Sequence, residues 1–179
     1  MKRTPAEIVK KARRIRLLLL DVDGVLTDGG IVMDDRGEEI KRFDVRDGHG
    51  IRMLMRGGIR VGLVTGRFSR AVRHRARDLG IRMVHQKVTD KVALYQKIKR
   101  KTGLKDQEIA YVGDDIVDLP ILREVGLSMA VKNCWTGLKQ VVDYVTAKDG
   151  GRGAVREIAE MLLKAQGKWE EIAQFYYRP

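Results

Sequence analysis

Four consecutive leucines, Leu17–Leu20, are followed directly by Asp21-Val22-Asp23-Gly24. A continuous apolar run of this length between charged residues is typical of a strand buried on both faces, as in a parallel sheet. In open α/β sheets, ligands bind at the carboxyl ends of the strands. We therefore expect Asp21 and Asp23 to lie at a functional site, although a lone Asp-x-Asp would more often be an acidic turn.

Strands and helices are expected to alternate along the rest of the chain. Apolar runs predict further strands at residues 59–64, 81–84 and 109–112, and weaker ones at 127–131 and 144–145. Helical patterns occupy residues 5–14, 69–79, 90–101 and 154–165, and one more helix is expected to begin after Asp47-Gly48-His49-Gly50. This alternation is typical of a doubly wound, Rossmann-like α/β sandwich around a parallel sheet. We expect one domain over residues 1–179, with a C-terminal tail over about 166–179.

One segment departs from this alternation. Residues 31–33 and 38–43 flank the turn-forming sequence Asp34-Asp35-Arg36-Gly37, which predicts a β-hairpin. We place the hairpin in an insert over about residues 29–43, which is too small to be a cap domain. A hairpin alone is marginally stable in water. We therefore expect neighbouring subunits to cover it and to close a site that would otherwise be open to solvent.

Charge and composition narrow the possible partners. The net charge of +12 is spread over the helices, and it suits either a nucleic-acid-binding protein or an enzyme that attracts small anionic substrates. Only 6% of the residues are aromatic, which is few for stacking on single strands. No apolar run approaches the ~18 residues of a membrane span, and no signal-type segment follows the basic N-terminus. We expect a cytoplasmic protein without a membrane partner, and Cys134, the only cysteine, cannot form an internal disulfide.

Reactive side chains follow three of the predicted strands. Asp21 and Asp23 follow the first strand, Thr65 the second and Asp114 the fourth, while Lys91 begins the helix after the third. In a parallel sheet these positions share one edge, and together they suit phosphoryl transfer. Asp21 can act as nucleophile, Asp23 as general acid and base, and Lys91 and Thr65 as donors to the phosphoryl oxygens. Asp21 and Asp114 offer the hard oxygen ligands that Mg²⁺ prefers.

These motifs resemble those of the haloacid dehalogenase-type phosphatases. The matching segments are Asp-x-Asp-Gly-Val-x-Thr at 21–27, Thr-Gly-Arg at 65–67, the single Lys91, and Gly-Asp-Asp-x-x-Asp at 113–118. The resemblance implies an aspartyl-phosphate intermediate on Asp21 and a Mg²⁺ ion held by Asp21, Asp114 and the backbone carbonyl of Asp23. It also implies that Asp115 and Asp118 lie around these ligands.

A narrower resemblance concerns 3-deoxy-D-manno-octulosonate (KDO) 8-phosphate phosphatases, which make a lipopolysaccharide sugar precursor. It rests on residues 43–48, 65–67, 150–157 and 162–168. The chain departs from that family at Lys87, where a glycine is usual, and at 134–137, which lack a usual proline. The resemblance implies a homotetramer whose hairpins and C-terminal tails complete neighbouring sites. The residues that it implies for substrate binding are Asp23, Asp44, Val45, Arg46, Asp47, Gly48, Arg52, Arg67, Arg75 and Lys91.

Two alternative functions would suit parts of this sequence. A sister enzyme could act on a nine-carbon ulosonate 9-phosphate, but such relatives tend to carry an acidic residue at the position of Arg67. A non-catalytic, nucleic-acid-binding protein on the same fold would not need the intact set of reactive residues. We expect Arg67, Arg75 and Arg52 to bind the carboxylate of an ulosonate substrate. Helix geometry places Arg75 about 60° from the apolar stripe, so either an anionic partner or an extended, solvated side chain fits it.

Overall fold

A six-stranded, all-parallel sheet forms the centre of the computed structural model, which describes residues 4–177. Its order is β5-β4-β1-β6-β7-β8, so the first strand lies in the middle of the sheet. The strands are β1 (Leu17–Leu20), β4 (Arg60–Val64), β5 (Met83–His85), β6 (Ile109–Gly113), β7 (Leu127–Ala130) and β8 (Tyr144–Val145). The doubly wound α/β fold expected from the sequence is confirmed.

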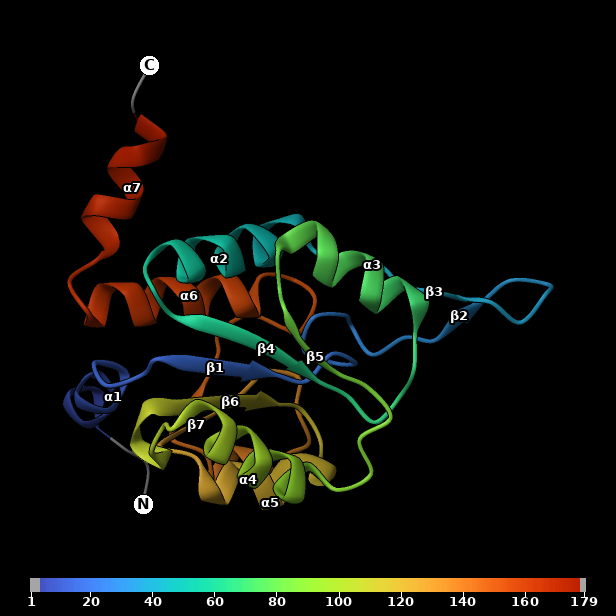
Figure 1. The fold of residues 1–179 in the computed structure, drawn as a ribbon, viewed down its shortest axis with the longest axis horizontal. Helices are drawn as coiled ribbons and strands as arrows, with labels where there is room; N and C mark the ends of the chain where they lie inside the picture. The colour runs from blue at the N-terminus through green and yellow to red at the C-terminus, as the bar shows by residue number, and fades with distance from the viewer. Residues whose placement is uncertain (1–3, 178–179) are drawn as a thin grey trace.

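Helices cover both faces of the sheet (Figure 1). They are α1 (Pro5–Ala12), α2 (Val45–Arg56), α3 (Arg70–Leu79), α4 (Lys91–Thr102), α5 (Leu119–Glu124), α6 (Ala154–Ala165) and α7 (Trp169–Tyr177). Short 3₁₀ turns lie at Asp106–Glu108, Ile116–Asp118 and Leu138–Gln140. Helices α2, α3 and α6 lie on one face, and α4 and α5 lie on the other. The face changes because the chain adds β4 and β5 on one side of β1 and then β6, β7 and β8 on the other. Within residues 4–177, no helix is long and apolar enough to cross a membrane.

The central position of β1 explains its leucines. Each leucine of β1 is fully buried, and the strand pairs with β4 on one side and β6 on the other. Leu20 is in register with both Leu63 and Val112, the residues near the ends of those strands. Asp21 N–H still donates to Val112 O at 3.0 Å. The Asp21 side chain is thereby fixed at the carboxyl edge of the sheet.

Helix α2 begins earlier than the sequence suggested. The Asp44 side chain accepts hydrogen bonds from the N–H groups of Arg46 and Asp47, so the helix is capped at Asp44 and already includes the two glycines. A Cβ on Gly50 would lie 3.0 Å from Arg156 Cα of α6. The glycine therefore allows close packing of α2 against α6, and its presence does not mark the start of the helix.

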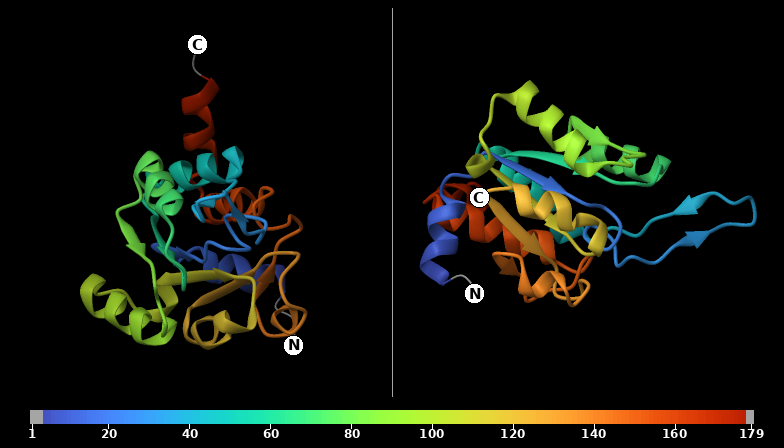
Figure 2. Two further views of the ribbon diagram at one scale, coloured as in Figure 1. Left: turned by 90° about the vertical axis from the view of Figure 1, so that its right-hand side faces the viewer. Right: turned by 90° about the horizontal axis from the view of Figure 1, so that it is seen from below.

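The β-hairpin is a separate two-stranded unit of β2 (Val32–Met33) and β3 (Glu39–Ile40), paired antiparallel. It projects from the body on the side toward which the strands of the main sheet point (Figures 1 and 2). Among the described residues no cap domain is inserted between β1 and α2, as expected.

The C-terminal segment forms helix α7, which projects away from the sheet (Figure 2). Its inner face packs through Ile172, and the guanidinium of Arg56 lies 3.6 Å from the centre of the Phe175 ring. The sequence indicated only an aromatic tail here, and its last residues, 178–179, lie outside the described range.

Candidate active site

A cavity of about 610 Å³ lies at the carboxyl ends of the central strands. It is lined by reactive residues from three strand ends, by the start of α4, and by residues 88–90 that precede this helix. The predicted residues that line it are Asp21, Asp23, Thr65, Arg67, Lys91, Asp114 and Asp115. The structure thus brings the predicted catalytic set together at one edge of the sheet.

The loop after β1 explains the spacing of the first motif. The N–H groups of Val25, Leu26 and Thr27 all donate to Val22 O, which closes a tight turn behind the two aspartates. Gly24 lies in this turn with φ +85°, and a Cβ at this position would lie 2.0 Å from Asp114 Oδ2. Only glycine fits both the backbone conformation and the contact.

The segment before α6 packs against the backbone of this loop. Gly151 N–H donates to Val25 O at 2.9 Å, and a Cβ on Gly150 would lie 1.7 Å from the carbonyl oxygen of Gly24. The glycines at 150 and 151 therefore let a distant part of the chain contact the backbone of the first motif. This contact explains why a glycine-rich segment precedes α6.

Lys91 is the first residue of α4, and its ammonium group is inside the site. Nζ donates to Asp21 Oδ1 at 2.9 Å, to Tyr111 Oη at 3.0 Å and to Asp118 Oδ1 at 2.5 Å. Burial opposes the charged form, but the carboxylates of Asp21 and Asp118 outweigh it and raise the pKa of Lys91. The lysine therefore remains a cation beside the expected nucleophile.

Asp118 organises the loop after β6. Its fully buried carboxylate accepts from the N–H groups of Asp114 at 3.0 Å and Asp115 at 3.3 Å through Oδ2. Its Oδ1 accepts from Lys91 and from the hydroxyl of Tyr111, the latter at 2.6 Å. Both oxygens are therefore engaged, so Asp118 orients Asp114 and Lys91. The Asp115 side chain accepts from Ile116 N–H and so begins the next 3₁₀ turn.

The donor set fits a magnesium ion. Carboxylate oxygens of Asp21, Asp114 and Asp118 lie within 4.8 Å of one another. Burial raises the pKa of Asp21 to about 7, although Lys91 opposes the shift, and burial together with the charge of Asp21 raises the pKa of Asp114 to about 7. A divalent cation would relieve this repulsion. Because Asp118 is already engaged, Asp21 and Asp114 are the carboxylates that could hold Mg²⁺, which takes only one or two. The backbone ligand expected from Asp23 stays a prediction.

The second strand end contributes Thr65 and Arg67. The buried hydroxyl of Thr65 accepts from Arg67 N–H at 3.2 Å and lies 3.4 Å from Asp23 Oδ2, to which it donates. The Arg67 guanidinium reaches over the cavity and donates to Glu39 Oε1 at 3.0 Å. This arrangement connects the second motif to the hairpin.

The predicted substrate residues at the start of α2 do not line the cavity in the described chain. They are Asp44, Val45, Arg46, Asp47 and Gly48. Asp47 is buried and accepts from the N–H groups of Gly153 at 3.2 Å and Arg156 at 2.8 Å, so it joins α2 to α6. Arg46 pairs with Asp44 at 2.7 Å. Asp44 and Asp47 therefore have structural roles in the chain, whereas Val45 and Arg46 are exposed. Contact of these five residues with substrate stays a prediction.

Arg52 and Arg75 also do not line this cavity. Both pair with Asp78 of α3, Arg75 at 2.7 Å and Arg52 at 3.3 Å. Arg75 additionally donates to Asp44 O at 3.4 Å. Arg75 therefore has an anionic partner about one turn further along the same helix, and its contact with substrate stays a prediction.

Three residues around the site were not expected there from the sequence, namely Glu39, Lys41 and Tyr111. The Lys41 ammonium pairs with Asp23 Oδ1 and with Glu39 Oε1, the latter at 3.0 Å, and its side chain is only 1% exposed. Glu39 and Lys41 are spaced i, i+2, which places them on one face of an extended strand. That alternation of charges was the available signal. Tyr111 lies within an apolar strand, so its sequence context indicated only core packing.

Known proteins with similar sequences and structures identify the family of this chain. A family model for haloacid dehalogenase-like hydrolases matches residues 42–126. The 3-deoxy-D-manno-octulosonate 8-phosphate phosphatase KdsC of Escherichia coli K12 is 46% identical over 166 residues, which cover 93% of this chain and 88% of that enzyme.

Solved structures agree with the sequence match. The crystal structure of the phosphatase of the same name from Yersinia pestis has a TM-score of 0.90 and 43% identity, covering 92% of this chain and 89% of that one. The Moraxella catarrhalis phosphatase, solved with a magnesium ion, a phosphate ion and KDO, has a TM-score of 0.94 and 40% identity, covering 97% and 99%. Identity at this level over nearly the whole length shows that the chain belongs to the 3-deoxy-D-manno-octulosonate 8-phosphate phosphatases, within the haloacid dehalogenase-like hydrolases.

Proposed function

We propose that this protein is a Mg²⁺-dependent phosphatase that hydrolyses 3-deoxy-D-manno-octulosonate 8-phosphate to 3-deoxy-D-manno-octulosonate and phosphate. The observation that carries the proposal is the convergence of Asp21, Asp23, Lys91 and Asp114 on one cavity. The relatives that share this chain's sequence support the choice of substrate. The product is a precursor of lipopolysaccharide, and a cytoplasmic location would suit that role.

The residues of the site suit a reaction in two half-steps. An oxygen of Asp21 attacks phosphorus, the bond to the sugar oxygen breaks, and Asp23 gives that oxygen a proton. Asp23 then takes a proton from water, and the resulting hydroxide releases phosphate from Asp21. Lys91 and Thr65 donate to the phosphoryl oxygens throughout. When bound, Mg²⁺ supplies positive charge that lets an anionic carboxylate approach an anionic phosphate.

Arginine side chains suit recognition of the second anion of the substrate. The phosphate already has Lys91 and Thr65 as hydrogen-bond donors. A planar guanidinium, by contrast, matches the carboxylate of an ulosonate in a bidentate pair. Arg67 is the arginine that lines the cavity in its own subunit. Arg75 and Arg52 lie together beside Asp78, and we assign them to the site of a neighbouring subunit.

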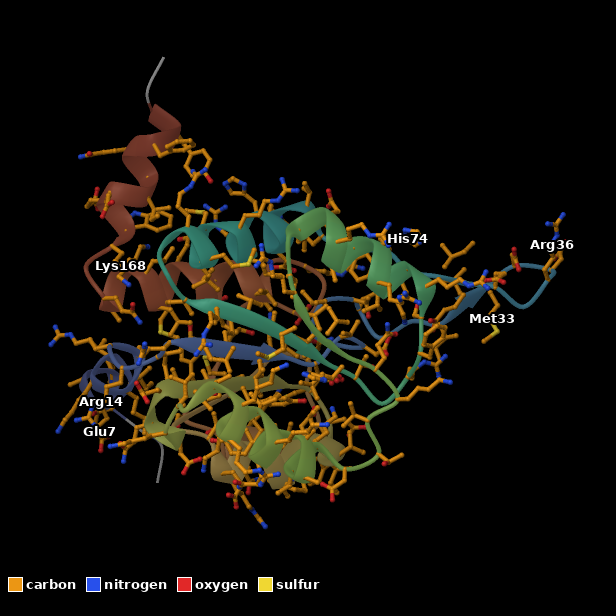
Figure 3. All side chains as sticks on the ribbon, viewed as in Figure 1. Glu7, Arg14, Met33, Arg36, His74 and Lys168 are labelled. Atoms are coloured by element: carbon orange, nitrogen blue, oxygen red, sulfur yellow. The ribbon has the colours of Figure 1, made fainter. Side chains whose placement is uncertain are left out.

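Exposed apolar residues on the hairpin support an oligomer. Ile31, Val32, Met33 and Ile40 are each 55–58% exposed. Met33 and Arg36 lie on the part of the hairpin that projects from the body (Figure 3). Such a hairpin is stabilised when other chains cover it. We assign the protein to a homotetramer in which neighbouring subunits complete each open cavity.

A phosphate-release assay on a small panel of substrates tests the proposal. We expect KDO 8-phosphate to have the highest kcat/KM, ahead of a nine-carbon ulosonate 9-phosphate and of p-nitrophenyl phosphate. Chelation should abolish turnover, and Mg²⁺ should restore it. A higher kcat/KM for the nine-carbon substrate would contradict the assignment of substrate, and full activity after exhaustive chelation would contradict the metal dependence.

A further inference from the structure

A buried ammonium group, that of Lys41, directly follows strand β3 of the hairpin. The side chain of Lys41 is 1% exposed, although lysine almost never occupies such a position without a charge partner. Its partners are Oδ1 of Asp23 and Oε1 of Glu39. Burial of an ion is costly unless paired charges and hydrogen bonds compensate for the lost water. Both carboxylates therefore fix the position of Lys41, and Lys41 in turn restricts theirs.

These contacts form a continuous chain of charged groups from Asp23 to Arg67. Glu39 Oε1 accepts from Lys41 and from the Arg67 guanidinium, each at 3.0 Å. Burial disfavours the charged form of Glu39, but hydrogen bonds from Lys41 and Arg67 outweigh it and lower the pKa of Glu39. When Asp23 is ionised, as it is after it has given up its proton, the chain alternates negative, positive, negative and positive charge. It joins the expected acid and base to the arginine that lines the cavity.

We propose that Lys41 and Glu39 are positioning residues of the phosphatase site, and that Lys41 holds the Asp23 carboxylate in the orientation for proton transfer. The proposal rests on the proposed function and assigns the hairpin a role in the chemistry of its own subunit. Glu39 holds Lys41 and Arg67 at fixed positions on either side of it. Neither residue has to touch the substrate.

The orientation of Asp23 depends on Lys41 because its other contact is weak. The hydroxyl of Thr65 reaches Asp23 Oδ2 only at 3.4 Å, near the limit of a hydrogen bond. A carboxylate that exchanges a proton must face the reacting oxygen within hydrogen-bond distance. Without Lys41, the Asp23 side chain could turn about its bonds, and the proton transfer would lose its fixed geometry.

Replacing Lys41 with methionine separates this role from a structural one. The quantity to measure is kcat/KM, which covers the steps up to formation of the aspartyl phosphate. An alkyl phosphate such as KDO 8-phosphate needs a proton on its leaving oxygen, whereas p-nitrophenolate leaves with little help. We expect Lys41→Met to lower kcat/KM by about 100-fold on the sugar phosphate and by less than about 10-fold on p-nitrophenyl phosphate.

Arg42→Met is the matched control. It removes the same charge from the adjacent position, where Arg42 is largely exposed and pairs with Asp28 outside the proposed chain. We expect this variant to stay within about two-fold of wild type on both substrates, a level typical of an exposed ion pair. Lys41→Arg should recover at least about ten-fold of the loss on the sugar phosphate, because it restores a cation between Asp23 and Glu39.

The outcome that overturns the proposal is an equal loss on both substrates in Lys41→Met, or no loss at all. If that variant does not fold, the isosteric Glu39→Gln serves instead. It should show the same dependence on the leaving group with a smaller loss, and an equal loss again overturns the proposal. If the wild-type enzyme does not hydrolyse KDO 8-phosphate, the proposed function is contradicted, but the positioning role of Lys41 and Glu39 is not. In that case the comparison is made on any alkyl phosphate that the wild type hydrolyses.

Discussion

Magnesium binding should release protons from this protein at neutral and mildly acidic pH. Asp21 and Asp114 both have a pKa of about 7, because both are buried near other carboxylates and Lys91 compensates only partly. At pH 6, in the metal-free protein, each of these two carboxyl groups is therefore protonated in most molecules. A cation binds only the deprotonated oxygens, so binding must displace these protons.

The magnitude follows from the two pKa values. Between roughly one and two protons should leave for each Mg²⁺ bound at pH 6. Well below pH 7, the apparent Kd should rise about 10-fold per pH unit for each proton displaced, and so about 10- to 100-fold between pH 6 and pH 5. Above pH 8 both groups are ionised, and the dependence should vanish.

Isothermal titration calorimetry in two buffers with different ionisation enthalpies measures the released protons directly. The control is Asp114→Asn, which removes one of the two carboxylates, so fewer protons should be released and binding should weaken. A binding heat that is independent of the buffer at pH 6, together with a constant Kd from pH 5 to 7, would refute the reasoning. Either the two carboxylates would then not be the ligands, or their pKa values would not be raised.

Three further outcomes are expected from single substitutions. Asp21→Asn should leave the circular dichroism spectrum unchanged and reduce turnover below about a thousandth of wild type, a change of roughly 4 kcal/mol in the barrier; more activity would mean that another residue is the nucleophile. Gly24→Ala should reduce Mg²⁺ affinity in calorimetry, because the new Cβ would collide with the Asp114 carboxylate. Arg67→Ala should weaken catalysis on the carboxylated sugar phosphate by roughly 2–5 kcal/mol and change p-nitrophenyl phosphate hydrolysis much less. Equal losses on the two substrates would reject carboxylate recognition by Arg67.

Much of the fold and the catalytic set could be predicted because both follow local rules. The leucines of β1 lie in a strand buried on both faces, and a residue that directly follows a parallel strand must lie at the sheet edge. The strand ends therefore bring together Asp21, Thr65 and Asp114, and this does not depend on the conformation of the loops. The cavity brings together the side chains that this rule selects.

The remaining parts depend on contacts between distant segments. Lys41 pairs with Asp23 only because the hairpin base folds back over the loop after β1, and no pattern within residues 29–43 states that. The helix that was expected to begin after Gly48 and Gly50 includes both glycines, because α3 and α6 pack closely against α2 there. Arg75 could not be assigned from helix geometry, since its partner Asp78 depends on side-chain rotamers.

The contact between the loop after β1 and the glycines at 150 and 151 has a consequence for synthesis of the chain. Gly151 N–H donates to Val25 O, and β1 also needs β6, at residues 109–113, as its second neighbour. Asp21, the proposed nucleophile, leaves the ribosome well before the segments that surround it in the folded protein. A nascent chain that ends before residue 150 should therefore be inert toward phosphate esters. Catalytic activity should arise only after residues 150 and 151 have left the ribosome and packed against the loop after β1, however early Asp21 itself is made.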